Sequence, residues 1–153
     1  MYLYSTRFQD GLTALVQEKV LPSSFDRITA PNHAYAICED CLQLSQRTEE
    51  FVYAIALNTK GKVLGVFEIS HGTVSMTCIQ PREIMIRLLL VGAVNFLVVH
   101  NHPSQDTRPS SEDLAVPNRL YTAGELIGIG LLDHIIVSDH SFCSLSETEG
   151  FPF

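Results

Sequence analysis

The chain has 153 residues, of which 46% are hydrophobic and 18% are charged, a composition that can bury the core of a single domain. It contains no uninterrupted apolar run of about 18 residues, the length that a membrane helix needs. Its start also lacks the basic segment and apolar stretch of a signal peptide. We therefore expect a cytoplasmic protein that does not contact membranes. The net charge of −7 argues against a surface that binds the phosphate backbone of nucleic acids.

The order of apolar and polar residues predicts an α/β protein. Helices are indicated where apolar residues recur at helical spacing, and strands where β-branched and other apolar residues run together. Lys60 and Gly61 separate two such strands and predict an antiparallel hairpin. The helix over 81–93 is apolar almost all round, so we expect it to be largely buried. The predicted helices are 10–20, 31–44, 81–93 and 110–124, and the predicted strands are 51–59, 62–70, 73–79, 94–100, 131–139 and 141–145.

These elements predict a mixed β-sheet sandwiched between helices. The strand over 94–100 is continuously apolar, as in strands that are covered on both faces, and it ends at His100. We divide the chain into an N-terminal extension of unknown role (1–27), one domain (28–148) and a C-terminal tail (149–153). The sequence leaves the oligomeric state open.

Two histidines follow one another closely at the end of this strand. His100 and His102 are two residues apart, and in extended backbone such residues project to the same side. Asp113 comes after a loop that is long enough to return its carboxylate to the histidines. Two imidazoles and one carboxylate are typical of catalytic zinc, which keeps its fourth position for water. The sequence therefore predicts a Zn²⁺ site.

A hydrolytic zinc site also needs a group that takes a proton from the metal-bound water and returns it. Glu68 is our candidate, because it lies near the end of an apolar strand, where a carboxylate is costly without a partner. Ser110 offers a hydroxyl that can hydrogen-bond an oxyanion beside the metal. It also stands three residues before Asp113, which is the pattern of a helix cap, so both interpretations of Ser110 stay open.

The pattern H-x-H-P, six residues, S-x-x-D at positions 100–113 resembles the JAMM metalloprotease motif of JAB/MPN domains. FEISHGT, QPREIMIRLLL, VVHNHPS, PSSEDL and LLDHIIVSD are more closely similar to the RadC-like branch, and the resemblance covers about residues 28–145. It implies a fold similar to that of cytidine deaminase, zinc held by the two histidines and Asp113, Glu68 as general acid/base, and Ser110 as oxyanion partner. It also implies that the protein hydrolyses a peptide or isopeptide bond, for example on a ubiquitin-like tail.

Two residues depart from that family pattern. Gln105 stands where RadC-like sequences usually have glycine, which predicts another path for the loop after the histidines. Pro117 lies within the predicted helix and leaves the carbonyl of Asp113 without its usual partner, which predicts a kink or a shortened first turn. If these residues spoil the geometry, the chain is a non-catalytic scaffold, as many MPN domains are.

The sequence also offers alternatives to a zinc hydrolase. The string HNHP is also found in HNH nucleases, and RadC-like proteins carry an older DNA-repair label, so a DNA-processing factor is an alternative that the acidity of the chain disfavours. A deaminase needs a P-C-x-x-C segment, and none follows His102. Cys38 and Cys41 have no second pair at zinc-finger spacing, so we interpret them as core thiols. His71 and His134 are expected to lie outside the ligand set.

Overall fold

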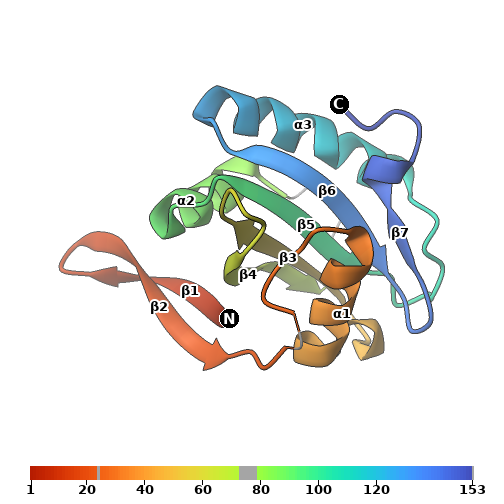
Figure 1. The fold of residues 1–153 in the computed structure, drawn as a ribbon, viewed down its shortest axis with the longest axis horizontal. Coiled ribbons are helices and arrows are strands. Elements are labelled where there is room, and N and C mark those ends of the chain that lie inside the picture. Colours follow the sequence, from red (N-terminus) through yellow and green to blue (C-terminus); the bar gives the residue numbers. More distant parts are fainter. Residues whose placement is uncertain (24, 73–78, 153) are drawn as a thin grey trace.

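The computed structural model describes residues 1–23, 25–72 and 79–152. These residues form a seven-stranded sheet in the order β2-β1-β4-β3-β5-β6-β7 (Figure 1). The pairs β1/β4 and β5/β6 are parallel and the others are antiparallel, so the sheet is mixed, as predicted. The elements are β1 (Tyr2–Gln9), β2 (Leu12–Val20), α1 (Pro31–Leu42), η1 (Leu44–Gln46), β3 (Glu50–Leu57), β4 (Val63–Gly72), α2 (Pro81–Val91), β5 (Asn95–Asn101), α3 (Ser111–Ile127), β6 (Gly130–Val137), β7 (Phe142–Ser144) and η3 (Leu145–Glu147).

The N-terminal segment is a hairpin of β1 and β2, so the helix predicted over 10–20 is wrong. Asp10 and Gly11 have φ values of 52° and 79° and lie between the paired residues Gln9 and Leu12. Two consecutive positive φ values define the type I′ turn that joins twisted strands, and Asp-Gly is one of its preferred pairs. This short turn signal outweighs the helical spacing of the apolar residues that follow it.

Helices cover both sides of the sheet and create two hydrophobic cores. We call the side covered by α1 the α1 face and the side covered by α2 and α3 the α3 face. Successive side chains of β3 alternate between the two, because the side-chain period of a strand is two residues. Tyr53, Ile55 and Leu57 pack in the α1-face core, whereas Val52, Ala54 and Ala56 pack in the α3-face core.

The structure confirms most of the other predicted elements. Helix α2 is the exception in its burial: Ile84, Met85 and Leu88 are buried, but Leu89 and Leu90 are 55% and 43% exposed. The expectation of a largely buried helix is therefore wrong, because α2 contacts the sheet along only one side. The strand predicted over 73–79 falls almost entirely outside the described residues.

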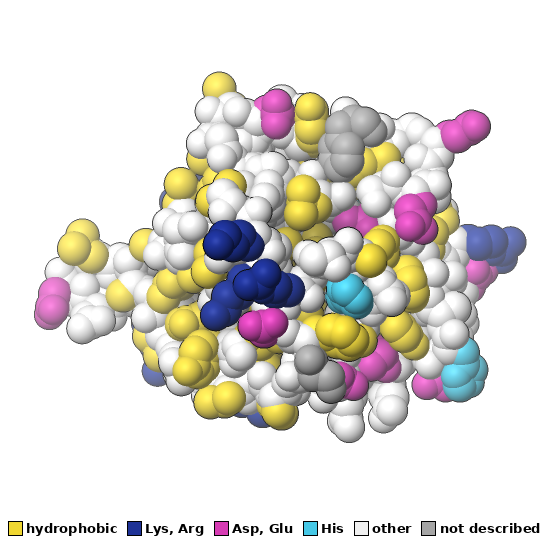
Figure 2. Space-filling model, viewed as in Figure 1, with side chains coloured by type: hydrophobic (Ala, Val, Ile, Leu, Met, Phe, Trp, Pro, Cys, Tyr) yellow, Lys and Arg dark blue, Asp and Glu magenta, His cyan; other side chains and the backbone are white. Residues whose placement is uncertain are grey.

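The surface carries apolar and charged side chains side by side. Figure 2 shows hydrophobic side chains scattered among polar ones on the face viewed in Figure 1, with a group of Lys and Arg side chains near its centre. A bridge between the backbones of Arg27 and Lys62 brings two basic residues together. Among the helices that the structure describes, none has the length and apolar character needed to cross a membrane.

Candidate metal centre

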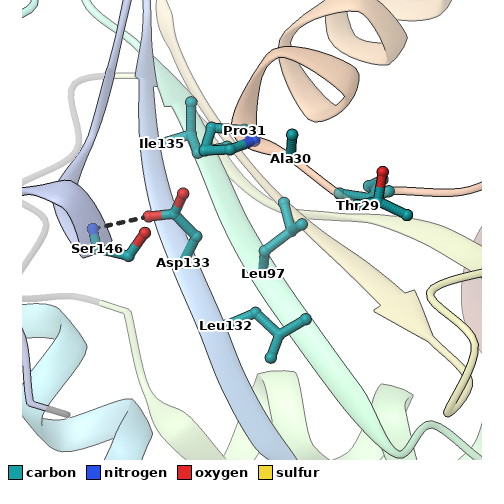
Figure 3. A pocket seen from close by; sticks show the side chains of 9 residues that line it. Thr29, Ala30, Pro31, Leu97, Leu132, Asp133, Ile135 and Ser146 are labelled. Atoms are coloured by element: carbon teal, nitrogen blue, oxygen red, sulfur yellow. Dashed lines mark hydrogen bonds between the residues drawn. The ribbon is translucent and has the colours of Figure 1, made fainter.

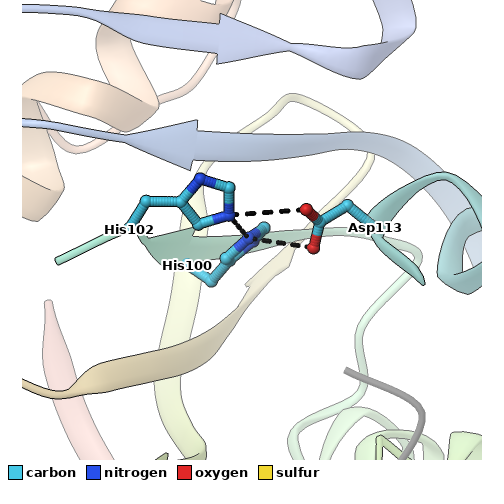
Figure 4. Close-up of side chains that lie close together, drawn as sticks. All are labelled: His100, His102 and Asp113. Atoms are coloured by element: carbon cyan, nitrogen blue, oxygen red, sulfur yellow. Dashed lines mark hydrogen bonds and ion pairs between the residues drawn. The ribbon is translucent and has the colours of Figure 1, made fainter. Parts of the chain in front are cut away.

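The sheet brings the three predicted ligands together on the α3 face (Figure 4). His100 is the penultimate residue of β5, a strand flanked by β3 and β6, and His102 follows directly after it. Asp113 lies in the first turn of α3. His100 and Asp113 are buried, and His102 is partly exposed. One ligand atom from each residue lies within 4.8 Å of the other two.

The distances between these atoms match those of a tetrahedral metal site. The Nε2 atoms of His100 and His102 are 3.0 Å apart. Oδ1 of Asp113 lies 3.2 Å from His100 Nε2, and Oδ2 of Asp113 lies 3.4 Å from His102 Nε2. Two ligands that each lie about 2.0 Å from a zinc ion at a tetrahedral angle are about 3.3 Å apart. The side chains are therefore spaced as they would be around one ion.

The second nitrogen of each histidine has its own partner. Nδ1 of His102 lies 2.6 Å from the carbonyl oxygen of Asp106, an acceptor, so this nitrogen carries the proton. Nδ1 of His100 lies 2.9 Å from Nε2 of the buried His134. A metal-binding histidine commonly donates its other N–H in this way, which fixes the tautomer and the ring orientation. In the tautomers that carry the proton on Nδ1, the Nε2 lone pairs of both histidines are directed at the shared point.

Asp113 has one oxygen that no hydrogen bond satisfies. Its Oδ2 accepts hydrogen bonds from the amide and the hydroxyl of Ser110, both at 2.7 Å. Its Oδ1 is buried and, among the described residues, receives no hydrogen bond, although His100 Nε2 is close enough for an ion-pair contact. A buried carboxylate oxygen without a donor is costly. A cation at the shared point would satisfy it, so the residues fit a metal.

The pKa shifts of His100 and Asp113 favour the forms of these two residues that bind a metal. Burial lowers the pKa of His100 and so favours its neutral form, although the contact with Asp113 opposes this effect. Burial alone would raise the pKa of Asp113, but the contacts with His100, His102 and Ser110 outweigh burial and hold that pKa well below its usual range. The contact with Asp113 raises the pKa of His102. A buried neutral imidazole beside an ionised carboxylate is the state that a divalent metal requires of its ligands.

Ser110 is the N-cap of α3. Its hydroxyl accepts a hydrogen bond from the amide of Asp113 at 3.1 Å, and the Asp113 carboxylate accepts one from the amide of Ser110, which completes a capping box. The capping interpretation of Ser110 is confirmed. Helix α3 continues through Pro117 to Ile127 with its first turn complete, so the predicted shortening of that turn is wrong.

Gln105 takes a backbone conformation that favours glycine. Its φ is 63°, in the left-handed region. Its side chain donates to the carbonyl of Ser45 at 3.1 Å and accepts from the amide of Asp139 at 2.7 Å. Gln105 therefore ties the loop after the histidines to η1 and to the segment between β6 and β7, and these hydrogen bonds offset the unfavourable φ.

The structure places Glu68 away from the three ligands. Glu68 pairs with Tyr53 in the register of β3 and β4, and its carboxylate accepts a hydrogen bond from the Tyr53 hydroxyl at 3.2 Å and contacts His71 Nδ1 at 2.8 Å. Tyr53 belongs to the α1-face core. Directly paired residues project to the same side of a sheet, so Glu68 lies on the face opposite the ligands.

Another glutamate lies at the site instead. Glu50, His102, Ser110 and Asp113 line one hollow of about 330 Å³, together with Pro103, Ser104 and Glu112. Burial raises the pKa of Glu50, although the nearby His102 lowers it. The sequence interpretation missed Glu50 because it ends a polar run directly before the strand predicted over 51–59. The sequence does contain a signal for Glu50. It stands two residues before Val52, a core residue of the same strand, so the two side chains project to the same face.

Two further features lie outside the site. On the α1 face, a hollow of about 210 Å³ is lined by apolar side chains that include Leu97 and Ile135 (Figure 3). Its buried carboxylate, Asp133, accepts hydrogen bonds from the hydroxyl of Ser144 and the amide of Ser146, so it needs no cation. Cys38 and Cys41 are buried and unpaired, which confirms the interpretation as core thiols.

Comparisons with known proteins identify the family. A family model described as a RadC-like JAB domain matches residues 28–151. A UPF0758 protein of Clostridium acetobutylicum is 40% identical over 121 residues, which are 79% of this chain and 52% of that protein. A UPF0758 protein of Bacillus pumilus is 42% identical over 119 residues (78% and 52%). A third, from Methanosarcina acetivorans, is 37% identical over 125 residues (82% and 53%).

The match covers most of this chain, which spans about half the length of these curated relatives. It begins after the β1–β2 hairpin and includes every ligand of the candidate metal centre. The mixed α/β sheet is consistent with a JAB/MPN-like fold. The chain therefore belongs to the RadC-like JAB domain family.

Proposed function

We propose that this protein is a cytoplasmic, zinc-dependent hydrolase of the JAMM type that cleaves a peptide or isopeptide bond. The observation that carries the proposal is the convergence of His100, His102 and Asp113 on one point, with two imidazole lone pairs and an unsatisfied carboxylate oxygen directed at it. Three protein ligands of this kind hold zinc and keep one position for the reaction. The unpaired buried thiols accord with a reducing compartment.

His100 and His102 would hold the ion through Nε2, and Asp113 through its carboxylate. When bound, zinc supplies Lewis-acid activation of water and polarisation of the amide carbonyl. The protein keeps the ligands in place through the partners of their outer atoms: Asp106 and His134 for the histidines and Ser110 for the carboxylate. These contacts fix the ligand geometry before an ion arrives, which lowers the cost of binding.

Ser110 is proposed to serve the reaction in a second way. Its hydroxyl lines the hollow beside His102 and Asp113, where the oxygen of a tetrahedral intermediate would carry negative charge. A hydroxyl that turns from Asp113 to this oxygen would stabilise it, and a donor in such a position is worth about 10²–10³ in kcat. The amide of Ser110 would keep its own hydrogen bond to Asp113 meanwhile.

Hydrolysis also needs a carboxylate that takes a proton from water and returns it to the leaving amine. The family resemblance assigns this role to Glu68. The hydrogen bonds of Glu68 to Tyr53 and His71 on the α1 face, and the position of Glu50 in the hollow beside His102, make Glu50 the rival candidate.

Metal analysis and a substrate panel test the proposed function. Protein purified without chelator should contain stoichiometric zinc, and it should cleave a member of a panel of peptides and isopeptide-linked ubiquitin-like tails. His102→Ala should lose both the zinc and the cleavage, whereas His140→Ala, an exposed histidine, should keep both. Wild-type protein that takes up no zinc would refute the proposal, and so would zinc-loaded protein that cleaves no member of the panel.

A further inference from the structure

We infer that Gln105 is a positioning residue of the candidate metal centre. Its side chain anchors the loop that follows the histidines, so that the carbonyl of Asp106 stays against the ring of His102. We call residues 103–109 the ligand loop. The inference rests on the proposed zinc site and deepens it, because it names a residue that orients one of the three ligands through another residue.

His102 depends on the ligand loop because the interior encloses it less completely than the other two ligands. The side chains of His100 and Asp113 are buried, whereas that of His102 is 16% exposed. His102 lies just past the end of β5 (Figure 4). Its Nδ1 donates to the carbonyl of Asp106 at 2.6 Å. A hydrogen bond of this kind orients the ring of a metal-binding histidine, so the position of the Asp106 carbonyl sets the orientation of His102.

The other contacts of Asp106 come from inside the ligand loop and cannot fix the loop to the body of the protein. Its amide donates to the hydroxyl of Ser104 at 3.4 Å, and its carboxylate accepts hydrogen bonds from Nε of Arg108 at 2.8 Å and 3.0 Å. Both members of this ion pair are open to solvent, so the pair contributes little. The anchor of Asp106 must come from another residue of the loop.

Gln105 supplies this anchor. Its side chain donates to the carbonyl of Ser45 in η1 at 3.1 Å, and it accepts from the amide of Asp139, between β6 and β7, at 2.7 Å. Among the described residues, it is the only side chain of the ligand loop that hydrogen-bonds to a residue outside 102–109. Two hydrogen bonds to different segments fix the place of Gln105, and Asp106 is the next residue.

Helix α1 holds both segments to which Gln105 binds. Ser45 is buried, and its amide and hydroxyl donate to the carboxylate of Glu39 on α1 at 3.1 Å and 2.5 Å. The carbonyl of Asp139 accepts a hydrogen bond from the hydroxyl of Tyr35, also on α1, at 3.3 Å. The side chain of Gln105 therefore connects the ligand loop to two segments that the same helix keeps in place.

The backbone of Gln105 shows that the side chain matters at this position. Among the described residues, three other than glycine have a positive φ: Asp10, Gln43 and Gln105. Asp10 lies in the turn of the N-terminal hairpin, and Gln43 is the C-cap of α1, two places where left-handed backbone is usual. Gln105 lies in neither. Glycine would take its φ of 63° without strain but could not form the bridge.

The affinity for Zn²⁺ tests the positioning role. Gln105→Gly relieves the strained φ and removes both hydrogen bonds, so the two effects on stability oppose each other and the melting temperature should change little. The affinity for Zn²⁺ should fall about tenfold or more, because the partner of a ligand is loosened. Competition with a chromophoric chelator measures it. Equal affinities in wild type and Gln105→Gly would overturn the inference.

Two further variants separate the bridge from the backbone conformation. Asp10→Gly relieves a positive φ of 52° in the hairpin turn, outside the ligand loop, and should bind zinc as wild type does. Gln105→Asn keeps the amide group and suits left-handed backbone, but it is one methylene too short to reach both Ser45 and Asp139. It should therefore lose as much affinity as Gln105→Gly. Wild-type affinity in Gln105→Asn would overturn the inference, since the span of the side chain would then be irrelevant.

A measurement on metal-free protein distinguishes this inference from the proposed function. In protein with ¹³C-labelled histidine, relaxation gives the order parameter of each ring. Gln105→Gly should lower the order parameter of the His102 ring and leave that of the buried His100 unchanged. An unchanged His102 ring would overturn the inference even if the protein is a zinc hydrolase. A more mobile His102 ring in a protein that takes up no zinc would support the positioning role and refute only the proposed function.

Discussion

Histidine–carboxylate pairs occur in two different regions of this molecule, the surface and the α3-face interior. His71 lies 2.8 Å from Glu68, and His140 lies 3.0 Å from Asp139, with exposed fractions of 58% and 38% in the first pair and 91% and 51% in the second. His100 lies 3.2 Å from Asp113, but these side chains are only 0% and 1% exposed. The exposed contacts are thus the shorter ones.

The difference teaches that burial, rather than contact distance, distinguishes the pair for which we propose a function. Water solvates both partners of an exposed pair, so the contact itself is worth little. In the interior, Asp113 has lost that water, and Oδ1 has no hydrogen bond among the described residues to replace it. A buried ionised group needs a partner charge or a metal. The buried pair therefore requires something further, and the exposed pairs do not.

Replacing the buried carboxylate should have the largest effect. Asp113→Asn keeps the size of the side chain and an acceptor for Ser110 but removes the charge, so the affinity for Zn²⁺ should fall by more than about 100-fold, beyond the loss expected from an outer partner of a ligand. Competition with a chromophoric chelator measures it. Asp139→Asn, the exposed control, should bind zinc as wild type does. Equal losses in the two variants would show that burial does not distinguish the pairs.

Removing the partner of His100 should have a smaller effect. His134→Leu leaves Nδ1 of His100 without its hydrogen-bond partner, and the affinity for Zn²⁺ should fall by about 10–100-fold. His134→Gln retains an acceptor oxygen and should recover part of this loss. The same chelator competition measures both variants. If His134→Leu bound zinc as tightly as wild type, the contact between His100 and His134 would have no part in orienting the ligand.

The smallest effect concerns the stability of the metal-free protein at low pH. Burial lowers the pKa of His134 well below its ordinary value of 6.5. Below about pH 6.5 the unfolded chain then binds more protons than the folded one, so the free energy of unfolding falls as pH falls, by about 1.4 kcal/mol per pH unit for this residue.

Thermal melting of metal-free protein between pH 7 and pH 5 checks this sign. His134→Gln should show a shallower fall in melting temperature than wild type over this interval. His140→Gln, which alters a histidine that is 91% exposed, should keep the wild-type slope. Parallel curves for wild type and His134→Gln would show that the buried histidine does not govern acid sensitivity.

Several elements could be predicted because each depends on local chemistry. Pro31 and Pro81 begin α1 and α2, since proline suits a first helical turn. The continuous apolar run before His100 corresponds to a strand buried in the middle of the sheet. The N-terminal hairpin was not predicted, and the reason is also local. The turn residues Asp10 and Gly11 favour a hairpin more strongly than the helical spacing of apolar residues in Leu12–Val20 favours a helix.

The sequence by itself predicted the three residues that the structure brings together as candidate metal ligands. The spacing of His100 and His102 at a strand end and the capping pattern before Asp113 are local features, and local backbone geometry places such side chains on one side. Only the tertiary structure decided what surrounds them. The face on which Glu50 or Glu68 lies depends on strand register, and a shift of one residue exchanges the faces. His134 reaches His100 only through the pairing of β5 with β6, a contact between residues far apart in the chain that no local pattern encodes.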